Sequence, residues 1–480
     1  SATLQSVSAV DFAAAALAVS TSGAVNITGG LLSASLMGLL QTNGNVTASG
    51  LAVQSNGQYG IRLSPSAAGT PSLTLAGQST VDNNGTTGSF AGISVAKGTL
   101  SVTNTQVIGN GGAGIELASG GPYTLTSVQA SNNAKSGVSL TSGSLTATGL
   151  SASSNHADGV TVGGGSAALT NATLASNAGS GLACAAAVPV DVGGGTLKGN
   201  TAAGISCGVG TLTVHDGTEI ASNGTGVQLT GAVTAITGAN VHDNTGAGIL
   251  INQSTGVTVQ ISSAASPVTI AKNQQQGIVV QSAPPVTGSG ANSVTIDSAT
   301  ISGNGSFGIY LQASDGPVAT TIKGNAVMGN SDAGLMIEQG PGNTTTEAIQ
   351  NNNVSGNNTK ASPRNVGGIL FNTSSTLTSF IGNSVHANGG DEIGFNALPG
   401  GGGTKWVITP PSNACDATAN SVYCYGVGNV GVHVLAPAAS VDAQHQHWAN
   451  NPPTSGIDTT GTVVSTNPCS AVTAACPASP

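Results

Sequence analysis

A short unit of one glycine, two apolar residues and one variable residue recurs along this chain. Residues 114–117 (GIEL), 137–140 (GVSL) and 159–162 (GVTV) are typical copies. Between residues 114 and 248 the glycine occurs at positions 114, 137, 159, 181, 204, 226 and 248, a step of 22 or 23 residues. A fixed step in this range is the signature of a solenoid, in which each repeat stacks on the previous one.

The alternation within the unit predicts what each coil is made of. An apolar, a variable and again an apolar residue follow the glycine, and this is the period of a β-strand with one buried face. The polar runs between units are rich in Gly, Ser, Asn and Thr, which favour turns. A coil of this length is too short for a propeller blade and contains no helical stretch. The sequence therefore predicts an all-β parallel β-helix of about 17 coils, with strands stacked about 4.8 Å apart.

Two columns of the repeat are expected to be structural. The apolar residues on either side of the variable position should form stacked ladders in the core. The asparagine four residues before the glycine is expected to form an internal ladder at a turn, because its amide can bond to turn backbone and to the asparagine of the next coil. Examples are Asn110, Asn133, Asn155, Asn177 and Asn200.

The spacing predicts one solenoid domain over residues 1–434 and a closing segment or cap over residues 435–480. From residue 249 on the step grows to between 26 and 37 residues, which indicates longer loops in the second half. Insertions in repeat proteins often lie on the functional face. The N-terminal end shows no comparable cap, which suggests an upstream segment, a partner or end-to-end stacking.

The pattern N-x-x-x-G-[ILV]-x-[ILVC], as in residues 133–140 and 200–207, resembles the coils of the right-handed parallel β-helix in the pectin-lyase-like superfamily. The resemblance is greatest to secreted bacterial β-helix-repeat proteins. It implies the right-handed winding, which the spacing alone does not show. The superfamily includes polysaccharide lyases, hydrolases and epimerases, and its lyases generally pair a basic residue with acidic calcium ligands on one exposed face.

Composition limits the partners of the chain. Of the 480 residues only 6% are charged, against roughly 25% in an ordinary globular domain. The formal net charge is −9 with nine Lys and Arg, which argues against nucleic acid because phosphate binding needs a basic stripe. No window reaches the roughly 20 apolar residues of a membrane span.

Six cysteines indicate an oxidising compartment, so a secreted or cell-surface protein with its signal peptide removed is expected. Cys415 and Cys424 lie close in sequence, as do Cys469 and Cys476, and each pair is predicted to form a local disulfide. Cys184 and Cys207 occupy the same inward column in adjacent coils, so their Cα atoms should be about 5 Å apart. Two alternatives stay open at this distance, a disulfide or two stacked buried thiols.

No metal or cofactor is expected, because no CxxC motif occurs. His445 and His447 alternate on one segment. Two interpretations stay open, a surface copper or zinc site or a plain polar segment.

Catalytic candidates are few. Hydrolysis would need two carboxylates across a groove, and the acids considered are Asp315, Asp332, Glu338 and the pair Asp391-Glu392. Asp315, Asp332 and Glu338 fall on different parts of the coil and form no obvious pair, and the basic residues are scattered. The sequence predicts no catalytic residues and favours a protein that is not an enzyme.

One outward column is more informative. The variable residue between the two core positions is mostly polar or small in the first half. It then becomes apolar in five consecutive coils, at Leu250, Val279, Tyr310, Met336 and Leu370. Such a stripe is costly to leave in water. Either the longer loops cover it, or it is a binding or association surface on which Tyr310 could stack on a sugar or on a partner side chain.

The leading functional hypothesis is a non-catalytic, secreted or cell-surface structural or adhesive β-helix that binds a glycan or a protein or assembles with itself. The second is a polysaccharide-active enzyme, a lyase or glycoside hydrolase, with a groove in the C-terminal half. The third is an ice-binding protein, since outward threonine pairs occur at Thr124 and Thr126 and at Thr146 and Thr148. Ala168 and Ala232 interrupt these rows.

Overall fold

A computed structural model describes most of the chain. The residues described are 1–65, 69–185, 187–208, 210–253, 258–282, 292–313, 318–339, 346–360, 366–372, 376–396, 406–408, 415, 419–425, 429–435, 440–444, 446–449, 453, 459–460, 463–464 and 468–469. Over these residues the regular structure consists of β-strands, and no helix is long and apolar enough to cross a membrane. The chain comprises two compact units, Ser1–Gly224 and Thr225–Pro480.

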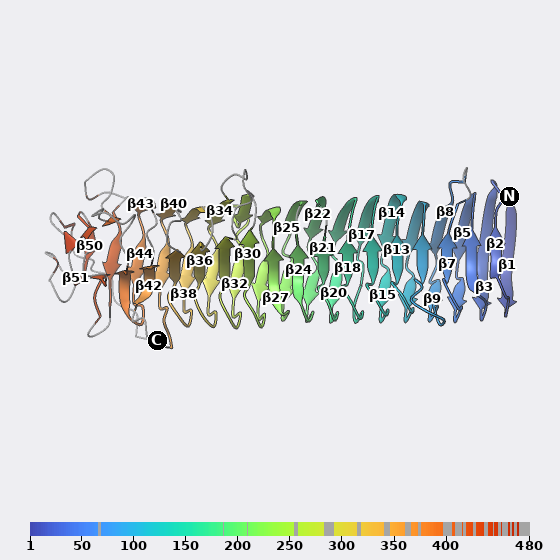
Figure 1. The fold of residues 1–480 in the computed structure, drawn as a ribbon, viewed down its shortest axis with the longest axis horizontal. Helices are drawn as coiled ribbons and strands as arrows, with labels where there is room; N and C mark the ends of the chain where they lie inside the picture. The colour runs from blue at the N-terminus through green and yellow to red at the C-terminus, as the bar shows by residue number, and fades with distance from the viewer. Residues whose placement is uncertain are drawn as a thin grey trace. The chain divides into compact units, whose positions relative to one another are not determined.

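In the first unit the strands stack in three parallel rows (Figure 1). The anchor row, which follows the repeated glycines, contains β2 (Ala15–Val19), β4 (Met37–Gln41), β7 (Ile61–Leu63), β10 (Ile93–Val95), β13 (Ile115–Leu117), β16 (Val138–Leu140), β18 (Val160–Val162), β21 (Leu182–Cys184) and β24 (Ala203–Cys207). The long row contains β1 (Ala2–Val10), β3 (Ala24–Ser33), β5 (Asn45–Ser49), β8 (Ser72–Ala76), β11 (Gly98–Thr103), β14 (Gly120–Thr126), β17 (Ser144–Thr148), β19 (Ser166–Thr170), β22 (Val188–Gly193) and β25 (Gly210–His215). The short row contains β6 (Ala52–Gln54), β9 (Thr80–Asp82), β12 (Gln106–Ile108), β15 (Gln129–Ser131), β20 (Thr173–Ala175), β23 (Thr196–Lys198) and β26 (Glu219–Ala221).

The second unit repeats these rows. Its anchor row contains β27 (Thr225–Leu229), β30 (Ile249–Gln253), β33 (Ile278–Ser282), β36 (Ile309–Ala313), β39 (Leu335–Gln339), β42 (Val366–Asn372), β45 (Asp391–Phe395), β48 (Val432–Val434) and β51 (Thr459–Thr460). The long row contains β28 (Ala232–Ile236), β31 (Thr258–Ile261), β34 (Asn292–Asp297), β37 (Val318–Lys323), β40 (Thr346–Gln350) and β43 (Thr376–Ile381). The short row contains β29 (Asn240–His242), β32 (Thr269–Ala271), β35 (Thr300–Ser302), β38 (Ala326–Met328), β41 (Asn353–Ser355), β44 (Ser384–His386), β47 (Ser421–Tyr423) and β50 (His447–Trp448). A small third sheet joins β46 (Trp406–Val407), β49 (Val441–Asp442) and β52 (Val463–Val464).

The predicted parallel β-solenoid is confirmed, with about 16 turns against the 17 expected. The predicted core ladders are also present. Ile115, Val138 and Val160 are paired in register on successive coils of the anchor row, and each side chain is fully buried. The interior is therefore built by repeating one inward alternation, so each added coil buries its own apolar residues against the next.

The repeated glycine is required by close packing between coils. A Cβ atom on Gly159 would lie 2.6 Å from the carbonyl oxygen of Gly181 and 2.9 Å from Nδ2 of Asn177. Both distances are shorter than a carbon atom tolerates, and both partners belong to the next coil. Adjacent coils therefore approach too closely at this corner for any side chain.

Gly159→Ala is expected to destabilise the first unit by about 2 kcal/mol, the usual cost of forcing an atom into a packed interior. Gly163→Ala, in the same coil, is the matched control, because a Cβ there would lie 3.5 Å from the carbonyl oxygen of Leu140, an ordinary contact. Urea denaturation of both variants tests this expectation. Equal midpoints for the two variants would contradict it.

The predicted asparagine ladder is confirmed in the first unit. Asn155 shows the arrangement: its Oδ1 accepts from the backbone N–H of Asn133 at 3.0 Å and from Nδ2 of Asn133 at 3.1 Å. Its own Nδ2 donates to the carbonyl of Ala130 at 3.0 Å and to Oδ1 of Asn177 at 3.0 Å. Each rung thus bonds to the buried turn of the coil before it and to the rung of the next coil.

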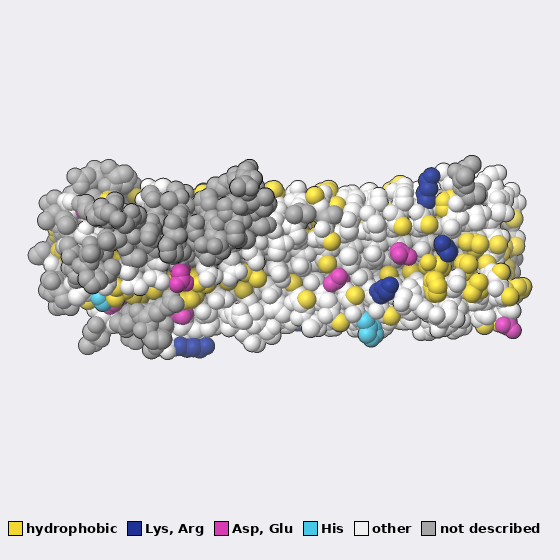
Figure 2. Space-filling model, viewed as in Figure 1, with side chains coloured by type: hydrophobic (Ala, Val, Ile, Leu, Met, Phe, Trp, Pro, Cys, Tyr) yellow, Lys and Arg dark blue, Asp and Glu magenta, His cyan; other side chains and the backbone are white. Residues whose placement is uncertain are grey.

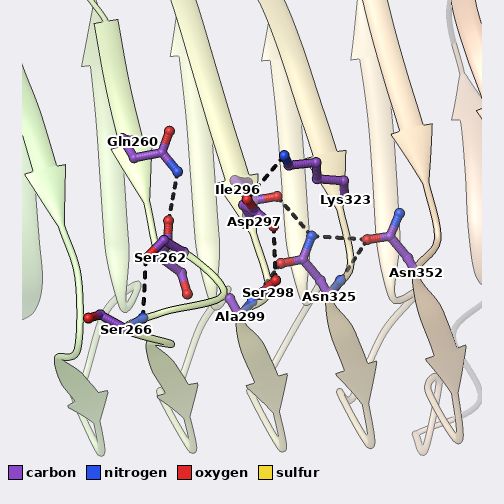
Figure 3. A network of polar contacts seen from close by, with 11 residues as sticks. Gln260, Ser262, Ser266, Ile296, Asp297, Ser298, Ala299, Lys323, Asn325 and Asn352 are labelled. Atoms are coloured by element: carbon purple, nitrogen blue, oxygen red, sulfur yellow. Dashed lines mark hydrogen bonds and ion pairs between the residues drawn. The ribbon is translucent and has the colours of Figure 1, made fainter.

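The second unit contains two such ladders, of which the second was not predicted. The first runs through Asn244, Asn273, Asn304, Asn330, Asn357 and Asn388. The second runs through Asn325, Asn352, Asn383 and Asn420. Figure 3 shows Asn325 accepting from the N–H of Ala299 and donating to Asn352, beside an ion pair of 3.2 Å between Asp297 and Lys323.

The ladders of the second unit end in different side chains. Asn388 donates from its backbone N–H to Oε1 of Glu392 at 3.1 Å and from Nδ2 to Oε2. Asn420 donates from the same two groups to Oε1 of Gln446, at 3.1 and 2.9 Å. Glu392 and Gln446 are both fully buried. A carboxyl and an amide therefore serve as equivalent ladder ends.

The predicted local disulfides of the closing region are wrong. Cys415 is bonded to Cys469, 54 residues away, with the two Cα atoms 5.5 Å apart. In a solenoid the nearest neighbours in space are a coil apart rather than a few residues apart, so proximity in sequence misled the prediction. Cys424 is also disulfide-bonded, and Cys476 lies outside the described residues.

Cys184 and Cys207 form a disulfide between adjacent coils, one of the two alternatives left open. Their Cα atoms are 4.4 Å apart, as expected for residues in register. These disulfides fit an oxidising compartment. In the closing region, β50 and β51 pair with β47 and β48, so the described strands there continue the stacking, and the domain boundary at residue 434 stays a prediction.

Candidate functional site

The five residues of the predicted apolar stripe lie in one outward column of the second unit. Register pairs Leu250 with Val279, Val279 with Tyr310, Tyr310 with Met336 and Met336 with Leu370, on β30, β33, β36, β39 and β42. The period-two alternation places them opposite the core. The structure therefore brings the five residues of the stripe together.

The stripe divides into a packed part and an open part. Met336 and Leu370 are buried at 0% and 3% exposure in a small cluster with Phe307, Ala333 and Val366. Phe307 and Ala333 lie in the turns before β36 and β39, and Val366 is the first residue of β42. Together they form a second core on the outside of the anchor row. The described residues that pack on this part of the stripe belong to these turns and to β42, and coverage by the longer loops stays a prediction.

The open part lines a depression. Leu250 and Tyr310 are half-buried, and they border a hollow of about 220 Å³ together with Val279, which is itself buried at 4% exposure. The remaining lining residues are Thr225, Ala247, Gln275, Gln276 and Gln281. The hollow thus combines one aromatic ring, aliphatic surface and three side-chain amides, with no charged group among its described lining residues.

The ring of Tyr310 is held in a fixed orientation. Its hydroxyl donates to Oε2 of Glu338 at 2.5 Å, and the ring of Phe307 lies 5.2 Å away at a tilt of 37°. Oε1 of Glu338 accepts from Nδ2 of Asn372 at 3.1 Å. The carboxylate therefore positions the phenol, and both of its oxygens are engaged.

A polar row that the sequence reasoning missed runs beside the stripe. Gln281 donates to Gln312 at 3.1 Å, Asn372 donates to Glu338, and Asn396 donates to Asn372 at 2.8 Å. Each of these residues is the fourth after a repeated glycine or its equivalent, two positions beyond the stripe. Comparing the residue at that position from coil to coil in the sequence would have identified this polar row. The row provides aligned hydrogen-bonding groups along the same face as Tyr310.

The other candidate acids have structural partners. Asp332 accepts from the N–H of Ala333 at 3.0 Å. Asp391 is buried, accepts from the N–H of Val430 at 2.8 Å and lies 2.5 Å from Nδ1 of His433. Asp315 lies outside the described residues, as does His445 of the possible metal site. The part of the chain that the structure describes contains no group of three or more metal-ligating side chains.

The buried Glu392 has the largest electrostatic perturbation. Burial raises the pKa of its carboxyl to about 8, although the hydrogen bonds from Asn388 act in the opposite direction. The neighbouring Asp391 raises this pKa further. Because Glu392 ends the asparagine ladder inside the coil, its raised pKa is explained by structure and needs no catalytic role.

The threonine rows considered for ice binding lie on the long row of the first unit. Thr124 pairs with Thr146 and Thr126 with Thr148 in register. The next coil places Ala168 opposite Thr146, so the expected interruption is present.

The repeat and its register agree with a known family. A family described as the right handed beta helix region matches residues 37–187, 136–267 and 225–405. The chain belongs to the right-handed β-helix family. Its membership supplies the handedness that the resemblance had implied. No curated protein matches this right-handed β-helix chain in sequence.

Two solved structures resemble the right-handed β-helix chain at low similarity. One is the A-module of the Azotobacter vinelandii mannuronan C-5 epimerase AlgE4, with 13% identity and a TM-score of 0.29 over 94% of this chain and 91% of that one. The other is the A-module of AlgE6 from the same organism, with 13% identity and a TM-score of 0.28 over 93% and 88%. Similarity at this level says nothing about what the present chain acts on.

Proposed function

We propose that this chain is a secreted or cell-surface adhesive β-helix whose second unit binds a neutral polysaccharide without cleaving it. The observation that carries the proposal is the hollow beside Tyr310. An aromatic ring of fixed orientation, in one hollow with Leu250 and with the amide of Gln281, offers the two contacts that a sugar ring needs. Its C–H face packs on the aromatic ring, and its hydroxyls bond to the amide.

The charge of this face supports a neutral ligand. The carboxylate of Glu338 is occupied by Tyr310 and Asn372, and the described lining of the hollow carries no cation that would attract an acidic polymer. On the face shown in Figure 2 the Lys and Arg side chains lie apart from one another and form no row. Recognition of an acidic glycan would instead need aligned basic groups.

Tyr310→Ala is expected to weaken retention on immobilised neutral polysaccharide by about tenfold, the effect of losing one aromatic stacking contact. Tyr423→Ala is the matched control in the same unit, because Tyr423 is half-buried and stacks on His386 with ring centroids 4.6 Å apart. Affinity electrophoresis of both variants measures the difference. Equal retention of the two variants would rule out Tyr310 as the contact.

Incubating the unsubstituted protein with polysaccharides separates binding from catalysis. A panel of polysaccharides is assayed for retention, for new chain ends and for unsaturated product. Retention without new ends is the expected result. New ends would overturn the non-catalytic proposal in favour of a polysaccharide-active enzyme, and Asp391 and His433 would then be the first residues to replace. If neither signal appears, a protein partner or self-association becomes the leading hypothesis.

A further inference from the structure

A second polar hollow lies on the first unit, at the outer corner between the long row and the short row. It has a volume of about 450 Å³ and crosses three consecutive coils. Its lining residues are Gln78, Thr80, Asn104, Thr105, Gln106, Ser127 and Gln129. We call it the amide trough. It shares no residue with the hollow beside Tyr310.

The trough is regular because the short row is in register. Thr80 on β9 pairs with Gln106 on β12, and Gln106 pairs with Gln129 on β15. The three side chains therefore follow one another at the strand spacing of about 4.8 Å. The row is limited in length, since the preceding partner of Thr80 is Ala52 and the next partner of Gln129 is Ser151.

The backbone beneath the trough is fixed. Gln78, Asn104 and Ser127 turn the corner with φ values of 60°, 47° and 52°. The N–H of Asn104 donates to the carbonyl of Thr126 at 3.0 Å, and the N–H of Ser127 donates to that of Thr148 at 2.9 Å. The corner is thus held by bonds between coils, so the side chains above it project from a rigid base.

The trough amides differ from the other aligned amides of this unit. In the interior ladder, the amides of Asn133, Asn155 and Asn177 each bond to the next rung. In the trough, the amides of Gln78, Asn104, Gln106 and Gln129 have no hydrogen-bond partner within the described part of the chain. Gln78, Asn104 and Gln106 are exposed, and Gln129 is half-buried. An ordered set of donors and acceptors therefore faces solvent, where a ligand can reach it.

The chemistry of the trough selects one class of ligand. A side-chain amide donates and accepts at once, which suits adjacent hydroxyls of a sugar. No charged group lines the trough. The nearest carboxyl along the row is Asp82 at the end of β9, whose Oδ1 accepts from the N–H of Ile108 at 3.1 Å. A neighbouring acid without a cation disfavours acidic polymers and nucleic acids.

From these observations we infer that the amide trough is a second binding site, specific for an uncharged polyhydroxylated chain, that is, a neutral oligosaccharide. Successive coils present Thr80, Gln106 and Gln129 in line, so one extended chain can contact all three. The site lies in the other compact unit from Tyr310. The intact protein then has two separate glycan contacts, which raises its avidity for a polymer when both engage the same chain.

The test uses full-length protein carrying Tyr310→Ala, so that the contribution of the first hollow is reduced by about tenfold. Neutral oligosaccharides of glucose, xylose and mannose and an acidic oligouronate are titrated by calorimetry. Residual binding of a neutral ligand is expected. It should fall about tenfold when Gln106→Ala and Gln129→Ala are added, because two hydrogen-bonding groups are lost.

Thr173→Ala is the control, because Thr173 is exposed on the same row two coils beyond Gln129 and outside the trough. It should leave binding unchanged. The inference is overturned if the Tyr310→Ala protein binds no neutral ligand, if the two glutamine substitutions change nothing, or if the acidic ligand binds more tightly. The loss of retention in Tyr310→Ala relative to the unsubstituted protein tests the first hollow, whereas the binding that remains in Tyr310→Ala tests the amide trough. Failure of one site is therefore distinguishable from failure of the other. Circular dichroism checks that the substituted proteins keep the fold.

Discussion

Asn155→Ala is expected to lower the free energy of unfolding by about 4 kcal/mol. The substitution leaves two buried donors of Asn133 without their acceptor and the carbonyl of Ala130 without one donor. Each buried polar group left unpaired costs about 1–3 kcal/mol. The loss exceeds that of a single hydrogen bond because one side chain joins three coils.

Urea denaturation, monitored by circular dichroism, measures this loss as a lower midpoint. Asn45→Ala is the control, because Asn45 is exposed at the start of β5, where a surface substitution changes stability by only about 0.5 kcal/mol. A midpoint for Asn155→Ala equal to that of the control would show that the ladder does not stabilise the solenoid. Hydrogen exchange should also show faster opening in the coils next to residue 155, since repeat proteins unfold locally.

Glu392→Gln is expected to raise the free energy of unfolding by about 3 kcal/mol at pH 7. Burial raises the folded-state pKa of Glu392 from 4.5 to about 8. Well below pH 4.5 the carboxyl is protonated in both the folded and the unfolded protein, so its burial as a charged group costs no stability. As the pH rises from 4.5 to about 8, the unfolded chain releases the proton while the folded chain keeps it, so stability falls.

Glutamine does not titrate, and its amide oxygen can still accept the hydrogen bonds at the end of the ladder. Oε1 of Gln446 already accepts two bonds from Asn420, which is the arrangement that the introduced amide would need. Unfolding free energies of both proteins at pH 4.5, 6 and 8 test the expectation. Their difference should grow with pH and level off near 8. A difference independent of pH would mean that Glu392 is not the group that retains the proton. Glu116→Gln, on the half-buried Glu116, controls for loss of a surface charge.

The candidate site was only partly predictable. The sequence identified Leu250, Val279, Tyr310, Met336 and Leu370 as one outward column, because alternation along a strand assigns each residue to a face. It did not separate Tyr310, which borders a hollow, from Met336, which is buried. That division depends on Phe307, which lies in a turn and belongs to no periodic column, and on Val366 at the start of β42.

The sequence alone determined the fold, the inward ladders and the first asparagine ladder, because these depend on the period within one coil and on a nearly constant step. The tertiary structure decided which residues of different coils meet. It paired Cys415 with Cys469, placed Glu392 at the end of a ladder and aligned Gln106 with Gln129. The physical reason is that neighbours in space are separated by a whole coil. Where loops vary in length, spacing along the chain no longer tells which side chains come into contact.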